Sequence, residues 1–231
     1  MKEYLKNSFN KSLKEKREYL LFNKVPLFII DFFPDHIDIN YIIKRIEKNI
    51  PPSFLVNIDA IYVGEFEELN NREIQAMYKD SAIYLSSFKN SNIPVSEEVI
   101  VVDIVHEIGH SFEEKVMYEL YHDKKLENEF ISKRKRLFEI LKSEEYKISE
   151  DLFLNPEYDE KFDLFLYKKI GYEKLSLLTV GLFTSPYSAT SLREYFANGF
   201  EEFYLGDKKY LMEICPTLFK KIKLISNIEE V

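Results

Sequence analysis

Two of the four histidines in the chain lie in the sequence HEIGH, residues 106–110. Residues four apart lie on one face of a helix, so His106 and His110 can bind one zinc ion, each through a ring nitrogen at about 2.1 Å. Glu107 faces the adjacent side, where its carboxylate can take a proton from a water molecule at the metal. Two ligands and a base that is not a ligand are the groups that a zinc hydrolase needs.

The motif ends a very apolar stretch, VIVVDIVHEIGH, which follows a candidate helix cap at Ser96. The alternative interpretation is a helix with two surface histidines. Burying histidine and glutamate in so apolar a helix is costly unless partners satisfy them, so the sequence favours a metal site.

The third ligand must come from another part of the chain. His36 and His122 lie in polar surroundings and are expected to be surface residues. Glu194 is the stronger candidate, because it stands beside the apolar residues 195–197 near the start of an expected helix. The alternative is a solvated glutamate that pairs with Arg193 or a nearby lysine.

Two polar residues could orient the ligands from outside the metal. Asn198 lies one helical turn after Glu194 and could accept the other ring N–H of a zinc-bound histidine. Asp103 lies three residues before His106 and could orient that imidazole, although a plain helix-surface carboxylate is an equal alternative.

The HEIGH motif and the segment SPYSATSLREYFANGFEEFYLGD, residues 185–207, together resemble the anthrax lethal factor-type zinc peptidases, which include the Pro-Pro endopeptidases. In that family the glutamate ligand lies in a Glu-Tyr/Phe-Phe-Ala sequence, which residues 194–197 match. A family tyrosine seven residues before the ligand assists catalysis, and Tyr187 occupies that position. The run from residue 61 to 86 also resembles the family's strand region, so the resemblance covers roughly residues 54–112 and 185–207.

The resemblance implies a zinc endopeptidase of zincin-like α+β fold that cuts a peptide or protein substrate. Glu107 would be its general base, and Tyr187 would donate a hydrogen bond to the oxyanion. We expect one domain over residues 1–231, with an N-terminal α/β lobe to about 112 and a helical lobe over about 113–231. The chain departs from the family in a probable helical insertion at about 120–175, and in Asn198, where relatives often carry an acidic residue.

Hydrophobic periodicity and turn residues predict the elements that must position these groups. The stretch AIYLS before the metal helix is expected to be a sheet edge where Ala82, Ile83 and Tyr84 bind an extended substrate, the alternative being an interior strand. The basic run at 132–142 is expected to be a solvated helix face. Asp35 or Asp38 could cap a helix that runs to about residue 48. Strands are predicted over 25–33, 54–66 and 81–87, and further helices over 2–22, 96–116, 123–143, 160–170, 172–183 and 190–205 and after Pro216.

Charge, apolar runs and cysteine content limit which partners and which cellular compartment are expected. A net charge of −8 does not attract nucleic acid or anionic membranes. The longest early apolar run is too short to span a bilayer, and the N-terminal residues lack the apolar segment of a secretory signal, which favours the cytoplasm. The single cysteine, Cys215, excludes an internal disulfide and is expected to be a small buried residue. The oligomeric state is not encoded.

Two other functions remain open. A cytosolic regulatory metallopeptidase that cleaves a repressor would carry its glutamate ligand sooner after His110, but Glu113, Glu114 and Glu119 lie too close on the same or continuing helix. A non-catalytic structural or interaction protein could keep a zinc ion on a peptidase scaffold without cleaving anything.

Overall fold

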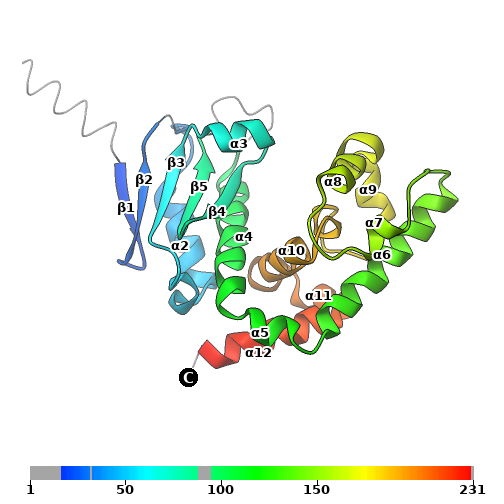
Figure 1. The fold of residues 1–231 in the computed structure, drawn as a ribbon. Helices are drawn as coiled ribbons and strands as arrows, with labels where there is room; N and C mark the ends of the chain where they lie inside the picture. The colour runs from blue at the N-terminus through cyan, green and yellow to red at the C-terminus, as the bar shows by residue number, and fades with distance from the viewer. Residues whose placement is uncertain (1–16, 32, 88–94, 230–231) are drawn as a thin grey trace, which may run out of the picture. The chain divides into compact units, whose positions relative to one another are not determined.

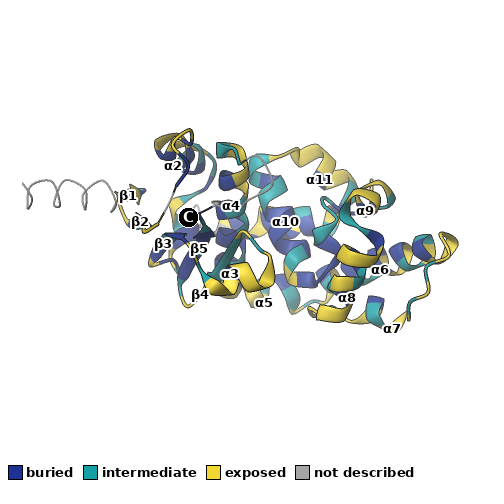
Figure 2. Cartoon of the chain, turned by 90° about the horizontal axis from the view of Figure 1, so that it is seen from above, coloured by how far each residue is buried: buried dark blue, intermediate teal, exposed yellow. Residues whose placement is uncertain are grey.

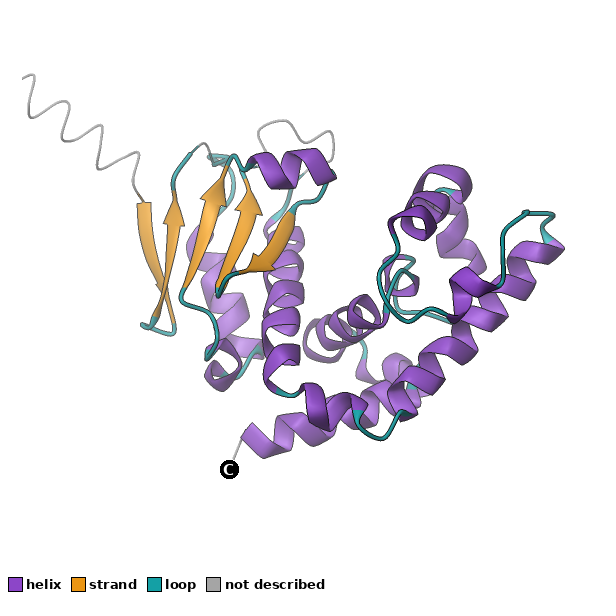
Figure 3. Ribbon diagram, viewed as in Figure 1, coloured by secondary structure: helices purple, strands orange, loops and turns teal. Residues whose placement is uncertain are grey.

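The structure, a computed structural model, describes residues 17–31, 33–87 and 95–229. The chain divides into two compact units, Met1–Phe112 and Glu113–Val231. The first contains a mixed five-stranded sheet with helices, and the second is almost entirely helical (Figure 3). The expected α+β class, with a sheet-containing N-terminal part and a helical C-terminal part, is confirmed. The single-domain organisation and the insertion stay predictions.

The sheet of the first unit has the strand order β1-β2-β3-β5-β4 (Figure 1). Its three middle strands are parallel, and an antiparallel strand pairs at each side. Aliphatic side chains such as Ile61 and Ile83 are fully buried, as expected for parallel strands inside a sheet. The strands are β1 (Arg17–Leu21), β2 (Val25–Ile29), β3 (Ala60–Gly64), β4 (Ala76–Lys79) and β5 (Ala82–Ser86).

The expectation that Ala82, Ile83 and Tyr84 form a sheet edge is wrong. β5 lies between β3 and β4, and Tyr78 of β4 is paired with Ile83. Asp80 and Ser81 both have positive φ, which produces a tight turn that folds the short strand β4 back along β5. Among the described strands, β4 is therefore the edge on this side of the sheet.

The helix predicted over residues 2–22 is contradicted at its C-terminal end, where residues 17–21 form β1. Phe22 and Asn23 both have φ near 52°, and the amide of Lys24 donates to the carbonyl of Leu21 at 3.1 Å. Two consecutive positive φ angles form a hairpin turn that pairs β1 with β2. Residues 2–16 lie outside the described residues.

Two long helices, α2 (Ile39–Asn49) and α4 (Glu97–Lys115), lie on the same face of the sheet (Figures 1 and 2). Both begin near the predicted caps: Asp38 accepts a hydrogen bond from the amide of Asn40 at 2.9 Å, and Ser96 accepts one from Val99 at 3.4 Å. The strand predicted over 54–66 is shorter than expected. Its first part belongs to η1 (Pro52–Leu55), and α3 (Glu67–Arg72) follows β3.

The second unit confirms most of the predicted helices, although α5, α7 and α11 were not predicted. No helix in the part of the chain that the structure describes is long and apolar enough to cross a membrane. The helical elements are α5 (Met117–Tyr121), α6 (Lys125–Ser143), α7 (Asp151–Leu154), α8 (Glu160–Leu164), the π-helix η2 (Phe165–Ile170), α9 (Tyr172–Leu178), η3 (Tyr187–Ala189), α10 (Leu192–Leu205), α11 (Lys208–Ile214) and α12 (Pro216–Glu229).

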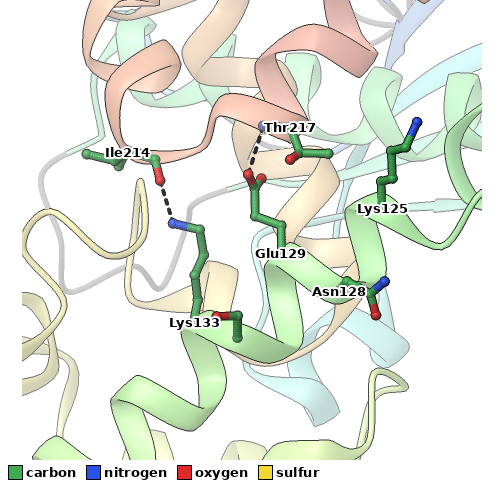
Figure 4. Close-up of a pocket in the computed structure, with 7 residues that line it drawn as sticks. Lys125, Asn128, Glu129, Lys133, Ile214 and Thr217 are labelled. Atoms are coloured by element: carbon green, nitrogen blue, oxygen red, sulfur yellow. Dashed lines mark hydrogen bonds between the residues drawn. The ribbon is translucent and has the colours of Figure 1, made fainter.

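Two charged side chains on α6 bind the ends of the last two helices (Figure 4). Glu129 accepts from the amide of Thr217 at 2.7 Å, in the first turn of α12. Ile214 is the last residue of α11, and its carbonyl accepts a hydrogen bond from Nζ of Lys133 at 2.5 Å. A carboxylate at a helix N-terminus and an ammonium at a C-terminus both complement the helix dipole. These side chains line a pocket of about 530 Å³ and fix the junction at the buried Cys215.

The basic run on α6 is not the solvated face that was expected, since Lys133 and Arg134 are buried. The guanidinium of Arg134 donates to the carbonyls of Leu152, Asn155 (2.8 Å) and Thr190 (3.5 Å), and it lies 4.1 Å from the ring centroid of Phe162. Burial lowers the pKa of Arg134 to about 9, so the guanidinium is still charged at pH 7. Arg134 therefore links α6 to the segment just before α10.

Replacing Arg134 with methionine should lower the free energy of unfolding by about 2–4 kcal/mol, because buried carbonyls would lose their donor. Urea denaturation of the metal-free chain measures this change. The matched control is Arg136→Met on the exposed side of the same helix, with an expected change below about 0.5 kcal/mol. Equal effects at the two positions would show that Arg134 has no special role in stability.

Candidate metal centre

The structure brings His106, His110 and Glu194 together. One nitrogen from each imidazole and one carboxylate oxygen lie within 4.8 Å of one another. Donor atoms around a four-coordinate zinc lie about 3.4 Å apart, so small side-chain rotations would complete the geometry. All three residues are half-buried. Two imidazoles and a carboxylate suit zinc and leave a fourth position for water or substrate, so the residues fit the expected metal.

The two histidines come from consecutive turns of α4, as the spacing predicted. Their ring centroids are 4.8 Å apart and the rings are nearly perpendicular, at 79°. Ile104, Val105 and Ile108 on the same helix are fully buried, which fixes the rotation of α4 about its axis.

Glu107 is held by the edge strand of the sheet. Its side chain is buried, with the residue 7% exposed, and Oε2 accepts a hydrogen bond from the amide of Tyr78 at 2.6 Å. The bond to a backbone amide limits the rotation of the carboxylate. The structure thus gives the predicted base a defined orientation next to both histidines, and its role in catalysis stays a prediction.

Glu194 lies in the first turn of α10. Ser191 caps this helix by accepting from the amide of Glu194 at 3.1 Å. Residues 195–197 are fully buried, and most of α10 is buried as well (Figure 2). Because Glu194 is only half-buried, its carboxylate lies on the side of the helix that keeps access to solvent. The buried residues 195–197 therefore hold in place the helix that carries Glu194.

Asn198 holds the turn that carries Tyr187 against α10. The Asn198 side chain donates to the carbonyl of Glu194 at 2.8 Å and accepts a hydrogen bond from the hydroxyl of Ser185. Thr190 closes the same turn by donating from its hydroxyl to the carbonyl of Tyr187 at 2.8 Å. The predicted contact of Asn198 with a histidine stays a prediction. Sequence reasoning missed Ser185, whose only signal was its place in a polar turn.

Tyr187 lies in a cluster of tyrosines and carboxylates. Burial raises the pKa of Tyr187 above its usual value, and the negative charges of Glu194 and Asp163 add to this effect. The rings of Tyr172 and Tyr187 have centroids 6.4 Å apart, and the hydroxyls of Tyr158 and Tyr172 donate to Asp163 at 2.9 and 3.4 Å. A raised pKa keeps the Tyr187 hydroxyl protonated and able to donate a hydrogen bond.

The other predicted residues lie as follows. Asp103 is half-buried one turn before His106, and its orienting role stays a prediction. His36 and His122 are exposed, and each ring bonds a backbone carbonyl, so their interpretation as surface residues is confirmed. Ala82 and Ile83 are buried and Tyr84 is half-buried in the interior strand, which removes the argument that they contact substrate.

Arg193 pairs with Glu113, an arrangement that the sequence did not indicate. Its Nε atom lies 3.0 Å from Oε2 of Glu113. The side chain of Glu113 is almost completely buried, whereas that of Arg193 is about half exposed. A single sequence carries no signal that would single out this glutamate.

Comparison with models of protein families, with curated proteins and with solved structures finds no match for this chain. The metal centre is therefore described by its own residues: a His-His-Glu group that could hold a metal ion.

We expect the chain to bind one zinc ion, with affinity that depends on all three residues. His110→Ala should weaken zinc binding by more than about 100-fold, since even the outer partners of metal ligands contribute 10- to 100-fold. Competition with a chromophoric chelator measures the dissociation constant. The control is His122→Ala, an exposed histidine outside the group, which should bind zinc like the wild type. Equal losses in both variants would place the metal elsewhere.

Proposed function

We propose that the protein is a zinc-dependent endopeptidase. The observation that carries this proposal is the combination of a His-His-Glu donor group with an acidic side chain, Glu107, that is buried and oriented beside it. Such a combination serves hydrolysis, whereas a purely structural zinc site closes its fourth position with another protein ligand. The resemblance of the motifs to the lethal factor-type zinc peptidases, with their zincin-like fold, supports the same activity.

The residues that would hold the metal are His106, His110 and Glu194. Zinc bound there would lower the pKa of a water molecule toward about 7 and polarise the substrate carbonyl. Glu107 accepts a proton from the water and later delivers it to the leaving amine. The Tyr78 amide holds one oxygen of this carboxylate at 2.6 Å, so the other oxygen is left to handle the proton.

The substrate would bind in an extended conformation along β4. The carbonyl of Gln75 accepts from Ser86 on β5, so backbone groups two residues apart, at Ala76 and Tyr78, point away from β5. An added peptide strand could bond to the outward backbone groups of Ala76, because β4 ends this side of the described sheet. The Tyr78 amide already binds Glu107, so a peptide on this edge would lie directly beside the base.

Tyr187 would stabilise the oxyanion that forms when the carbonyl is attacked. Its hydroxyl stays protonated, because burial and the nearby carboxylates raise its pKa. Its position seven residues before Glu194 matches the catalytic tyrosine of the family that the chain resembles. The predicted insertion, residues 120–175, provides Asp163 and Tyr172 around it.

Glu107→Gln should reduce peptide cleavage by about 10²- to 10⁴-fold while zinc is still bound, because the amide cannot accept the proton. Zinc-loaded protein is incubated with a diverse peptide library, and the cut sites are read by mass spectrometry. Glu139→Gln, on the exposed side of α6, is the matched control and should cut normally. Zinc-loaded wild-type protein that cuts no peptide would argue against the endopeptidase.

Tyr187→Phe should lower kcat by about 10²- to 10³-fold with little change in KM, since a donor to the transition state is lost while the ring remains. Steady-state kinetics on a peptide from the library experiment separates the two constants. Tyr167→Phe, an exposed tyrosine of η2, serves as control. An unchanged kcat in Tyr187→Phe would show that the Tyr187 hydroxyl does not take part in catalysis and that the residue serves only in packing.

A further inference from the structure

An ion pair links the last turn of α4 to the first turn of α10. Nε of Arg193 lies 3.0 Å from Oε2 of Glu113, and a guanidinium nitrogen lies 3.8 Å from Glu114. The side chain of Glu113 is 1% exposed and that of Arg193 is 49% exposed. The contact is therefore a partly buried ion pair, which solvent screens less than a surface pair.

Glu113 has a second donor, the hydroxyl of Tyr121 on α5. Burial raises the pKa of Tyr121, and the charge of Glu113 raises it further, so this hydroxyl remains a donor. A buried carboxylate needs such partners, because removing one leaves an uncompensated charge. Glu113 thus has its two oxygens directed at Tyr121 and Arg193 and has little freedom to move.

The ion pair adjoins both halves of the metal centre. Glu113 follows His110 by three residues on one continuous helix, and Arg193 directly precedes Glu194. A functional site tolerates errors of only about 0.5 Å in the placement of its side chains. A bond between these two positions restricts how the start of α10 can move against the end of α4, and therefore where the Glu194 carboxylate lies.

The ion pair also controls the charge next to the third ligand. Arg193 is adjacent to Glu194 and, without Glu113, its guanidinium could pair with the Glu194 carboxylate. Such pairing would compete with the metal for that carboxylate. The pair with Glu113 instead holds the guanidinium at the last turn of α4.

We propose that Glu113 and Arg193 are positioning residues that set the metal affinity by acting through Glu194. The proposal rests on the metal centre of the proposed function, but it does not require that the protein cleave peptides. Tyr121 supports the pair from the opposite side of the Glu113 carboxylate.

The test is zinc affinity of the full chain, measured by chelator competition. Arg193→Gln should weaken zinc binding by about 10- to 100-fold, the range known for residues that orient metal ligands. Arg193→Lys should recover part of the loss, since it keeps the charge. Arg136→Gln, an exposed arginine of the same unit, is the matched control and should leave the affinity unchanged.

Making the same substitution in a Glu194→Ala chain distinguishes an effect of Arg193 on the position of Glu194 from an effect on the stability of the fold. In a Glu194→Ala chain, which retains weak binding by the two histidines, Arg193→Gln should change zinc affinity by less than about twofold, because the residue it positions is gone. Urea denaturation with a chelator present reports any change in the metal-free fold.

Two outcomes would overturn the proposal: wild-type zinc affinity in Arg193→Gln, or an equal loss of affinity in the wild-type and Glu194→Ala backgrounds. Protein that binds zinc as expected and cuts no peptide would reject the endopeptidase while leaving this result standing. A wild-type chain that binds no zinc would overturn the metal centre itself.

Discussion

The group that could hold a metal ion forms only where the carboxylate of Glu194 meets two imidazoles that lie one helical turn apart on α4. Several contacts hold the first turn of α10 in place. Ser191 caps it, the apolar residues 195–197 are buried, and Asn198 binds both its backbone and the turn that carries Tyr187. Each contact is modest alone, at about 1 kcal/mol for a typical hydrogen bond, but together they leave Glu194 few positions to occupy.

The helical unit depends on buried charges that bind backbone groups or each other. Glu129 binds amides at the start of α12, Lys133 binds carbonyls at Leu182 and at the end of α11, and Arg134 binds carbonyls of the segments on either side of the tyrosine cluster. Helix ends leave unsatisfied amides and carbonyls, and short helices expose many of them. Charged side chains can satisfy these groups inside the unit, and here they join α6 to the end of α11, to the start of α12 and to the carbonyls of Leu182, Asn155 and Thr190.

The sequence predicted the parts of this protein that local chemistry determines. The HEIGH spacing identified two ligands, the apolar neighbours of Glu194 suggested the third, and Asp38 and Ser96 marked helix starts because a cap acts within one turn. It did not predict β1 or β4, because each strand has only four or five residues and is paired through a hairpin turn that lacks the glycine usually found in such turns. The sequence did not indicate that β5 is an interior strand, because no glycine marks the hairpin turn at Asp80 and Ser81 that pairs β4 with β5. The basic run with Lys133 and Arg134 was expected to be solvated, and it is buried because its partners lie far away in the chain.

The central claim is that two histidines and one glutamate hold a single metal ion. X-ray absorption at the zinc edge of the zinc-loaded chain tests it most directly, because the spectrum reports the donor atoms themselves. The structure predicts two imidazole nitrogens with carboxylate and solvent oxygen at about 2.0–2.1 Å, and a changed oxygen shell in Glu194→Ala. A shell containing sulfur, or one that is identical in Glu194→Ala, would contradict the assignment.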